Sequence, residues 1–536
     1  MSTRPLPARR AGGRGVAGEP RLHRRQFVLG PEPWLAADGW VSEQITPSLH
    51  LSRCAELPVA SVTDGHGVPW WLLGVALQSD ADAPAPLDQL AEHAQGPLLA
   101  LYASWSGRWL LFSDTELHID ASGLLGCFYR TVHRGPKAQL WVSSSLALIA
   151  ALPGCDPVSS AAPGLHLGKG MDWYPPPRSR FAGVKKLLPT QILSLAAGTE
   201  RRVVARSPLA DVPKPKTYER ALDILQRNLV TSLSRLRERP DRIWLPLTSG
   251  LDSRLILAAA RDADVPLSTF TQTYPLMESG DRRLPPLLAR AVGYEHRELR
   301  PKSFSRDRQA LFDAHTAGDC ADGDRRFFAH GQWEMFAPPA IILRGGVFEL
   351  GRCYFHGKFP EPDAEDLVHA ISTRFHFREF HPTSCAHFAG IAEWVEWAAA
   401  TSYAGLDWRD RLYLEQRIAG WVSSIEQALD LTAYERLYIA NCHTYLATVL
   451  TLPESARRDG QHHTDLIGRM APELLRFPFN PADDRWRLAR RLRDEWHEFA
   501  ARPRKRRYAA YTAQRGAGRA RQALARLRGD RHPADD

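Results

Sequence analysis

Hydrophobic and polar positions follow two different patterns along this chain. Up to about residue 205, short apolar runs are separated by turns rich in Gly, Asp, Ser and Pro. The runs lie at 70–77, 98–105, 108–112, 140–144 and 192–195. Short apolar runs bounded by such turns are typical of strands. The pattern therefore predicts a sheet-rich first half.

From Tyr218 onward the apolar spacing changes to three and four, which predicts an amphipathic helix over 218–236. Apolar strands are then predicted at 243–247, 268–272 and 340–344, with helices at about 253–262 and 283–292 between them. Strands that alternate with helices in this way indicate a parallel sheet with crossover helices. Beyond about residue 365 the pattern is mostly helical.

Composition divides the chain into four expected parts. Residues 1–25 are rich in Pro, Gly and Arg and have too little apolar content to pack, so we expect a flexible basic leader. The segment PLADVPKPK at 208–216 is typical of a connection between domains. We expect a sheet-rich domain at 26–210, a parallel-sheet domain at 217–500 and a basic C-terminal tail at 501–536.

The formal net charge of +9 comes from the two tails, and the body between them is mildly acidic. Basic tails are more typical of solvated or docking arms than of a nucleic-acid-binding face, and no zinc-finger spacing accompanies them. No apolar run approaches the roughly 18 residues of a membrane span, and the start lacks a signal-peptide pattern. The seven cysteines are dispersed, which indicates reduced thiols. We expect a cytoplasmic protein without a membrane partner.

The strongest local signal is IWLPLTSGLDSRLILAAA at 243–260, which combines an apolar strand, a tight turn and a helix. Backbone amides in such a turn, together with the positive end of the helix, form an anion site. Small residues at 248–250 allow close approach of a phosphate, and Asp252 is placed to hold Mg²⁺ on it. An ordinary strand-to-helix turn with Ser and Asp caps is the alternative.

Residues 248–253 resemble the SGGxDS loop of the asparagine-synthetase-like family, with Ser249 in place of the first Gly. The resemblance implies that ATP is cleaved between its α and β phosphates and that ATP and Mg²⁺ are the cofactors. The family's next strand lies against adenine and is followed by an acid, a Gly and a His, which match Asp281, Gly293 and His296. The implied nucleotide-binding residues are Leu247, Thr248, Ser249, Gly250, Leu251, Asp252, Ser253, Thr271, Gln272 and Thr273.

Two later stretches extend the resemblance. LRGGVFELGRCYF at 343–355 is similar to the family's SGxGxDE motif, which implies nucleotide contacts by Gly345 and Gly346 and metal binding by Glu349 beside Asp252. A surface carboxylate is the alternative for Glu349.

Residues 413–431 resemble the segment that carries the base of β-lactam synthetases. The resemblance implies that Glu426, paired with Tyr354, deprotonates the attacking amine, and that Lys505 is the catalytic lysine. An ordinary helix-surface residue and a solvated tail charge are the respective alternatives for Glu426 and Lys505.

Residues 107–131 and 142–152 look like the later part of a class II glutaminase domain. The implied fold is α/β and α+β: an N-terminal Ntn-type β-sandwich-like domain followed by an adenine-nucleotide α-hydrolase-like parallel-sheet synthetase domain. Glutaminases of this class use a Cys at the mature N-terminus, whereas Met1 is followed here by Ser2 and the first cysteine is Cys54. We therefore expect an inactive glutaminase domain.

The resemblance implies an ATP-dependent, AMP-forming carbon–nitrogen ligase that adenylates a substrate carboxylate, which an amine of the same substrate then attacks. The product is expected to be a macrolactam or isopeptide ring, as in lasso-peptide cyclases, or a small lactam. The partners implied are a peptide or small-molecule substrate and a protein of the same pathway. Amidation with free ammonia, a non-catalytic scaffold protein and a nucleic-acid-associated enzyme are the alternatives.

Overall fold

A computed structural model describes most of the chain between residues 21 and 481. The described residues are 21–134, 137–158, 173–196, 202–207, 209, 212–273, 277–300, 306–319, 336–359, 366–380, 384–401 and 406–481. All of them belong to one compact unit, while the second unit, from Arg487 to Asp536, lies outside the described residues. The expected C-terminal tail and Lys505 therefore also lie outside them.

The first half forms two antiparallel six-stranded sheets, ordered β10-β8-β9-β1-β3-β2 and β12-β11-β7-β6-β5-β4. The strands are β1 (Phe27–Gly30), β2 (Trp40–Thr46), β3 (Leu49–Cys54), β4 (Val59–Thr63), β5 (Pro69–Gln78), β6 (Trp105–Phe112), β7 (Glu116–Ile119), β8 (Phe128–Arg134), β9 (Lys137–Ser143), β10 (Lys185–Lys186), β11 (Gln191–Ser194) and β12 (Val203–Ala205). Leu29 and Leu51 of one sheet share a buried core with Leu73 and Leu110 of the other. The predicted sheet-rich half is confirmed.

The run at 98–105 is an exception to the strand pattern. Its first residues form the short helix α2 (Leu98–Tyr102), and only Trp105 begins a strand. Pro97 is the N-cap residue of this helix, and it has no amide to donate to a strand ladder. The other short helices of this half are α1 (Pro86–Ala91) and α3 (Leu146–Ala150).

The second half contains a five-stranded sheet in the order β15-β14-β13-β16-β17, with all neighbours parallel. Its strands are β13 (Arg242–Pro246), β14 (Leu267–Gln272), β15 (Glu295–Leu299), β16 (Ala340–Leu343) and β17 (Glu435–Leu437). The predicted parallel sheet is confirmed, but the two edge strands β15 and β17 were not predicted. β15 reads EHREL and exposes most of its residues, so it lacks the apolar run that marks a buried strand.

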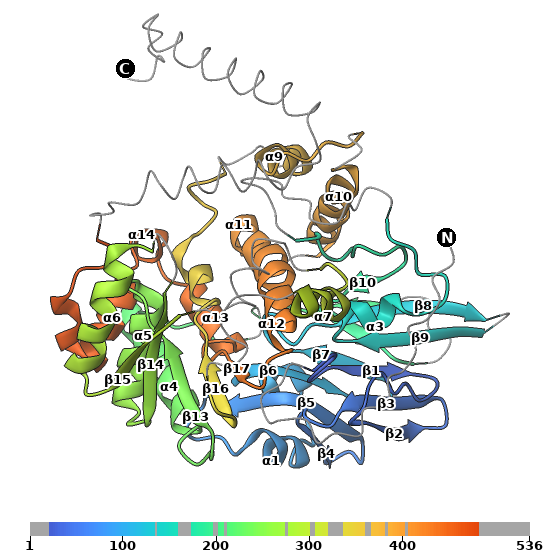
Figure 1. The fold of residues 1–536 in the computed structure, drawn as a ribbon, viewed down its shortest axis with the longest axis horizontal. Coiled ribbons are helices and arrows are strands. Elements are labelled where there is room, and N and C mark those ends of the chain that lie inside the picture. Colours follow the sequence, from blue (N-terminus) through green and yellow to red (C-terminus); the bar gives the residue numbers. More distant parts are fainter. Residues whose placement is uncertain are drawn as a thin grey trace, which may run out of the picture. The chain divides into compact units, whose positions relative to one another are not determined.

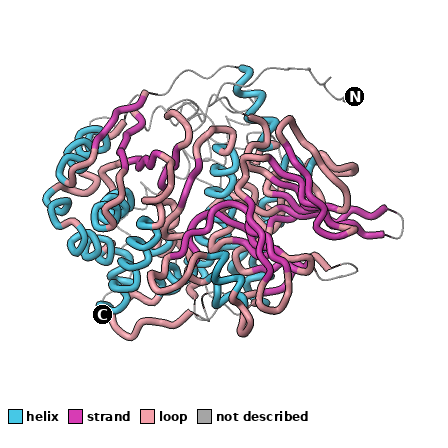
Figure 2. The backbone as a smooth tube through the Cα atoms, turned by 90° about the horizontal axis from the view of Figure 1, so that it is seen from below, coloured by secondary structure: helices cyan, strands magenta, loops and turns pink. Residues whose placement is uncertain are grey.

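Helices flank this sheet and continue to the end of the described chain (Figures 1 and 2). They are α4 (Tyr218–Ser234), α5 (Leu251–Asp262), α6 (Ser279–Ala291), α7 (Arg306–Thr316), α9 (Leu367–Arg374), α10 (Cys385–Ala400), α11 (Trp408–Leu412), α12 (Ser423–Leu429), α13 (His443–Leu450), α14 (Glu454–Arg458) and α15 (Gln461–Met470). The 3₁₀ helices η1 (Phe348–Arg352) and η4 (Pro472–Arg476) and the π-helix η3 (Tyr413–Val422) complete the list.

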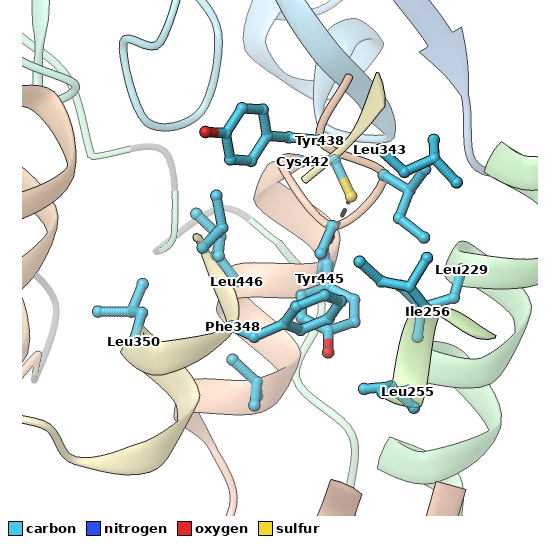
Figure 3. Close-up of a cluster of buried hydrophobic side chains, with 14 of the residues drawn as sticks. Leu229, Leu255, Ile256, Leu343, Phe348, Leu350, Tyr438, Cys442, Tyr445 and Leu446 are labelled. Atoms are coloured by element: carbon cyan, nitrogen blue, oxygen red, sulfur yellow. Dashed lines mark hydrogen bonds between the residues drawn. The ribbon is translucent and has the colours of Figure 1, made fainter. Parts of the chain in front are cut away.

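The core between the parallel sheet and its helices positions the loops at the sheet edge. Leu229 of α4, Leu255 of α5 and Leu343 of β16 pack into it (Figure 3). Phe348, just after β16, lies edge-on to Tyr445 of α13, with ring centroids 5.8 Å apart. This packing ties the loop after β16 to the helices that cover the sheet.

Residues 21–25, assigned from composition to the flexible leader, are packed against the second half. His23 and Arg24 are buried, and the backbone amide of His23 donates to Nδ1 of His315 at 3.0 Å. The two terminal guanidinium nitrogens of Arg25 donate to backbone carbonyls, those of Thr432 and Ala433. The expected boundary at residue 25 is therefore wrong by several residues, because these basic side chains find carbonyl partners that composition cannot reveal.

Candidate functional site

The candidate site lies at the carboxyl edge of the parallel sheet. From β13 the chain first builds β14 and β15 on one side and later β16 and β17 on the other. The strand order therefore reverses between β13 and β16, and open parallel sheets bind ligands at such a reversal. The loops that leave these two strands, residues 247–250 and 344–347, frame the site.

The loop after β13 is braced by local hydrogen bonds. Thr271 Oγ1 donates to the carbonyl of Leu247 at 2.7 Å, and the amide of Thr248 donates to Ser253 Oγ at 3.2 Å. Gly250 begins helix α5 without any side-chain capping bond. The first-turn amides of a helix that has no side-chain cap are well placed to bind an anion.

Ser249, one of the implied nucleotide-binding residues, makes its hydrogen bonds within the protein. Both its amide and its hydroxyl donate to Asp281 Oδ1, at 2.8 and 2.7 Å, and its side chain is buried. Asp281 stands in the first turn of α6, and the close packing of that helix brings its carboxylate to the loop. Asp281 therefore anchors the loop through both the amide and the hydroxyl of Ser249.

We expect Asp281→Ala to loosen the loop. A hydrogen bond to a charged group stabilises by about 1.5–3 kcal/mol, so exchange of the Ser249 amide should accelerate about 10- to 100-fold. Hydrogen–deuterium exchange of a peptide that covers 247–253 measures the change. Glu295→Ala, which removes an exposed acid on β15, is the control. Equal protection in Asp281→Ala and the parent chain would remove Asp281 from this role.

The two carboxylates expected to bind metal come together. Arg352 Nη2 lies 3.2 Å from Asp252 Oδ2 and 3.6 Å from Glu349 Oε1. Tyr413, at the start of the π-helix, donates its hydroxyl to Glu349 Oε2, while His463 Nε2 lies 3.3 Å from Asp252 Oδ1. Burial and then the Glu349 carboxylate raise the pKa of Tyr413 well above its usual value, so this phenol remains a proton donor.

The donor chemistry of Asp252 and Glu349 fits Mg²⁺ held together with phosphates. Within the described residues, no group of three or more His, Cys, Asp or Glu side chains is arranged to hold a metal. Magnesium in nucleotide sites commonly uses only one or two carboxylates, with phosphate and water oxygens as the other ligands. Asp252 Oδ1 is buried and has no hydrogen-bond partner, although His463 Nε2 lies 3.3 Å away. The guanidinium of Arg352, which contacts both acids, would compete with a cation for these carboxylates.

The glycines after β16 lie directly against the site. A Cβ at Gly345 would stand 3.4 Å from Asp252 Cβ, and one at Gly346 would stand 3.4 Å from the ring of Tyr438. A small residue at each position keeps the loop close to its neighbours. Their expected contact with nucleotide remains a prediction.

Glu426 is buried, and the tyrosine that it contacts is not the expected one. It is fully buried, and its Oε1 accepts hydrogen bonds from Arg344 Nε at 3.0 Å and Tyr438 Oη at 2.6 Å. Arg436 Nε lies 3.7 Å from Oε2. The surface-residue alternative is therefore wrong, and the tyrosine partner is Tyr438 and not Tyr354. Burial and the Glu426 carboxylate raise the pKa of Tyr438.

Tyr354 lies in another cluster. Its ring centroid is 5.1 Å from that of Tyr413, and Lys358 Nζ lies 3.0 Å from its centroid. This cation–π contact places a lysine near the Glu349 side of the site. Sequence reasoning considered Lys505 alone, which lies outside the described residues.

A buried arginine holds the end of the described chain against the loop. Arg254 Nη2 donates to the carbonyls of Ser249 and Pro478, and Nη1 donates to those of Leu474 and Phe477. Burial lowers the pKa of Arg254 to about 10, still far above neutral pH, so the group stays charged. Arg254 thus fixes the loop relative to residues 474–478.

Strand β14, which was expected near adenine, makes hydrogen bonds to the neighbouring strand β15. Thr273 donates its amide to the carbonyl of Leu299 at 2.8 Å, and Gln272 ends β14 with a half-buried side chain. His296 Nδ1 contacts Thr269 Oγ1 at 2.9 Å, and Gly293 adopts φ 81° in the turn before β15. His296 therefore braces neighbouring strands, and contacts between Thr271–Thr273 and adenine remain a prediction.

The sequence reasoning missed several residues of the site. They are Arg344, Arg352, Tyr413, Tyr438 and His463. Arg344 directly follows the apolar strand β16, so its position at the carboxyl edge was available as a signal, whereas the short strand before Tyr438, ERL, has no apolar run. Nothing local marks His463, which reaches Asp252 from α15.

Comparisons with known proteins add little to this geometry. No protein-family model and no curated protein matches the chain. Two solved structures are similar over part of it. One is the allosteric regulatory enzyme of purine biosynthesis, with 9% identity over 55% of this chain and 73% of that chain and a TM-score of 0.20. The other is glutamine phosphoribosylpyrophosphate amidotransferase from B. subtilis complexed with ADP and GMP, with 9% identity over 61% and 71% and a TM-score of 0.19. Likeness this weak carries no argument.

In the described part of the chain, no helix is both long enough and apolar enough to cross a membrane.

Proposed function

We propose that this chain is an ATP-dependent, AMP-forming ligase of the asparagine-synthetase-like type that joins a carboxylate and an amine of one substrate. The observation that carries the proposal is the meeting of Asp252 and Glu349 at a single nitrogen of Arg352. The two acids follow different strands, β13 and β16, at the point where the strand order reverses. A pair of carboxylates beside an uncapped helix start suits a metal–triphosphate ligand.

Different residues of the site would have different roles in activating the carboxylate. Thr248, Gly250 and the first turn of α5 would bind phosphate oxygens, while Asp281 and Arg254 keep the loop in place. Bound Mg²⁺ would neutralise the charge that develops on the departing pyrophosphate. Arg344, held through its Nε by Glu426, stands beside the loop and would add positive charge at the same edge.

In this proposal the sheet-rich half has a structural role and does not supply ammonia. Strand β1 begins at Phe27, and the residues before it, 21–25, are packed against the second half. Among the described cysteines, Cys54 and Cys127 are buried, and burial raises the pKa of the Cys127 thiol. In this proposal the amine comes with the substrate, and the product would be a lactam or isopeptide ring.

In the experiment, the chain is incubated with ATP labelled at its α-phosphate, with Mg²⁺ and with peptides that carry a free N-terminal amine and an internal Asp or Glu. The proposal expects labelled AMP and a peptide product lighter by one water. Added glutamine should release no glutamate. Labelled ADP in place of AMP, or ATP-stimulated glutamate release, would count against the proposal.

Glu426→Gln tests the corrected role of that residue. Since Glu426 is buried between Arg344 and Arg436, we expect the substitution to leave two arginines poorly compensated. Pyrophosphate exchange into ATP and ring formation should then fall together, by about 10-fold or more, and the melting temperature should drop. Glu435→Gln, on a partly exposed acid of β17, is the control. Exchange that persists while product disappears would restore Glu426 as the amine's base.

A binding or scaffold protein is the second candidate. The contact of Arg352 with both acids favours it, because the guanidinium offsets part of their negative charge without a metal. Formation of labelled AMP in the experiment above excludes this second function.

A further inference from the structure

Arg352 is the unexpected residue of the carboxylate pair. It ends the 3₁₀ helix η1, and Cys353, which follows it, turns the chain with φ 53°. One nitrogen of Arg352, Nη2, contacts both Asp252 and Glu349. The side chain is 26% exposed.

The other oxygen of each carboxylate already has a neighbour on its far side. Tyr413 donates to Glu349 Oε2, and His463 lies beside Asp252 Oδ1. His463 is 1% exposed, and neither of its ring nitrogens has a hydrogen-bond partner. The two oxygens that meet Arg352, Asp252 Oδ2 and Glu349 Oε1, are therefore the ones available for a shared cation.

Arg352 is held on one edge only. Its Nε is buried and has no hydrogen-bond partner, so the carboxylates account for its described polar contacts. A long, planar guanidinium pairs well with phosphate as well as with carboxylate. It can therefore exchange one anion for the other by rotation of its side chain.

We propose that Arg352 is a built-in counter-ion that excludes divalent cations from the Asp252–Glu349 pair until a triphosphate draws the guanidinium away. The triphosphate part rests on the proposed function, and the exclusion of cations does not. With Arg352 on the acids, the triad carries one net negative charge and leaves no shared oxygen pair open. With Arg352 on phosphate, both acids can bind the metal.

Mn²⁺ binding to the nucleotide-free, full-length chain, measured from the electron paramagnetic resonance signal of free Mn²⁺, tests the exclusion. We expect weak binding by the parent chain and binding at least ~10-fold tighter in Arg352→Met, because two facing carboxylates without a counter-ion attract a divalent cation. Arg352→Lys keeps the charge and should bind weakly. Asp252→Asn added to Arg352→Met should abolish the gain.

Arg220 supplies a control, because it contacts Asp223 at 3.9 Å at an exposed position and does not bridge a pair of facing acids there. Arg220→Met should leave Mn²⁺ binding unchanged. A similar gain in this variant, or a gain that survives Asp252→Asn, would overturn the proposal. So would parent-chain binding as tight as that of Arg352→Met.

Arg352→Gln repeats the test if the Met variant does not fold, as judged by circular dichroism. The parent chain provides a further check without substitutions: α,β-methylene ATP should raise Mn²⁺ binding at the protein beyond that of the free analogue, and this gain should require Asp252. If the analogue does not raise Mn²⁺ binding in this way, the proposal is overturned. Failure of AMP formation with the Mn²⁺ results intact would instead reject the ligase alone.

Discussion

Asp252→Asn should lower AMP formation by about 10²–10³-fold, the loss usual for a group that stabilises developing charge. The side chain starts helix α5 beside the loop, and both of its oxygens face cationic or polar neighbours, Arg352 and His463. The amide keeps the volume but loses the charge that would hold the metal. The measurement is the initial rate of labelled AMP formation under saturating ATP and Mg²⁺.

The matched control is Asp262→Asn, at the far end of the same helix. Asp262 accepts a hydrogen bond from Gln226 at an exposed position, so its loss should change the rate little. Circular dichroism must show that both variants fold. Full activity in Asp252→Asn would falsify the assignment of the loop.

Arg108→Met should lower the free energy of unfolding by about 3–5 kcal/mol, because it leaves a buried carboxylate without its partner. Arg108 of β6 forms two hydrogen bonds of 3.0 Å with Asp430, and both side chains are buried. Although burial alone would raise it, the Arg108 guanidinium holds the pKa of Asp430 below its usual range. The pair therefore stabilises the fold above the unfolded pKa of about 3.9 and loses that contribution as the pH falls.

Urea unfolding followed by circular dichroism measures this change. Replacing both partners, in Arg108→Met with Asp430→Leu, should recover much of the loss, since the unpaired charge is then removed. Arg220→Met, which breaks an exposed contact with Asp223 at 3.9 Å, should shift stability by less than about 1 kcal/mol. An unchanged midpoint in Arg108→Met would show that the pair does not stabilise the junction between β6 and the end of α12.

This junction also bears on the candidate site. The amide of Gly107 in β6 donates to the carbonyl of Tyr438, and Asn441 donates to the carbonyl of Gly107. Tyr438 is the residue that binds Glu426. The sheet-rich half therefore positions a residue at the edge of the parallel sheet, a structural role that does not require glutaminase chemistry.

The sequence by itself determined the parts of this protein that depend on local pattern. The spacing of apolar residues predicted α4 and α5, and the continuous apolar runs predicted β13 and β16. The acids of two separate motifs, Asp252 and Glu349, were also identified, and the structure brings them together. Local pattern suffices here because burial of one helix face or strand follows from the chain's own periodicity.

Only the tertiary structure decided which partner each polar side chain binds. Ser249 binds Asp281 of α6, Glu426 binds Tyr438 beyond β17, and Arg352 contacts both expected metal ligands. The polar edge strand β15 likewise depends on its pairing with β14. These contacts join residues far apart in the chain, and a buried charge or hydrogen-bonding group must be satisfied by whatever packing brings near it.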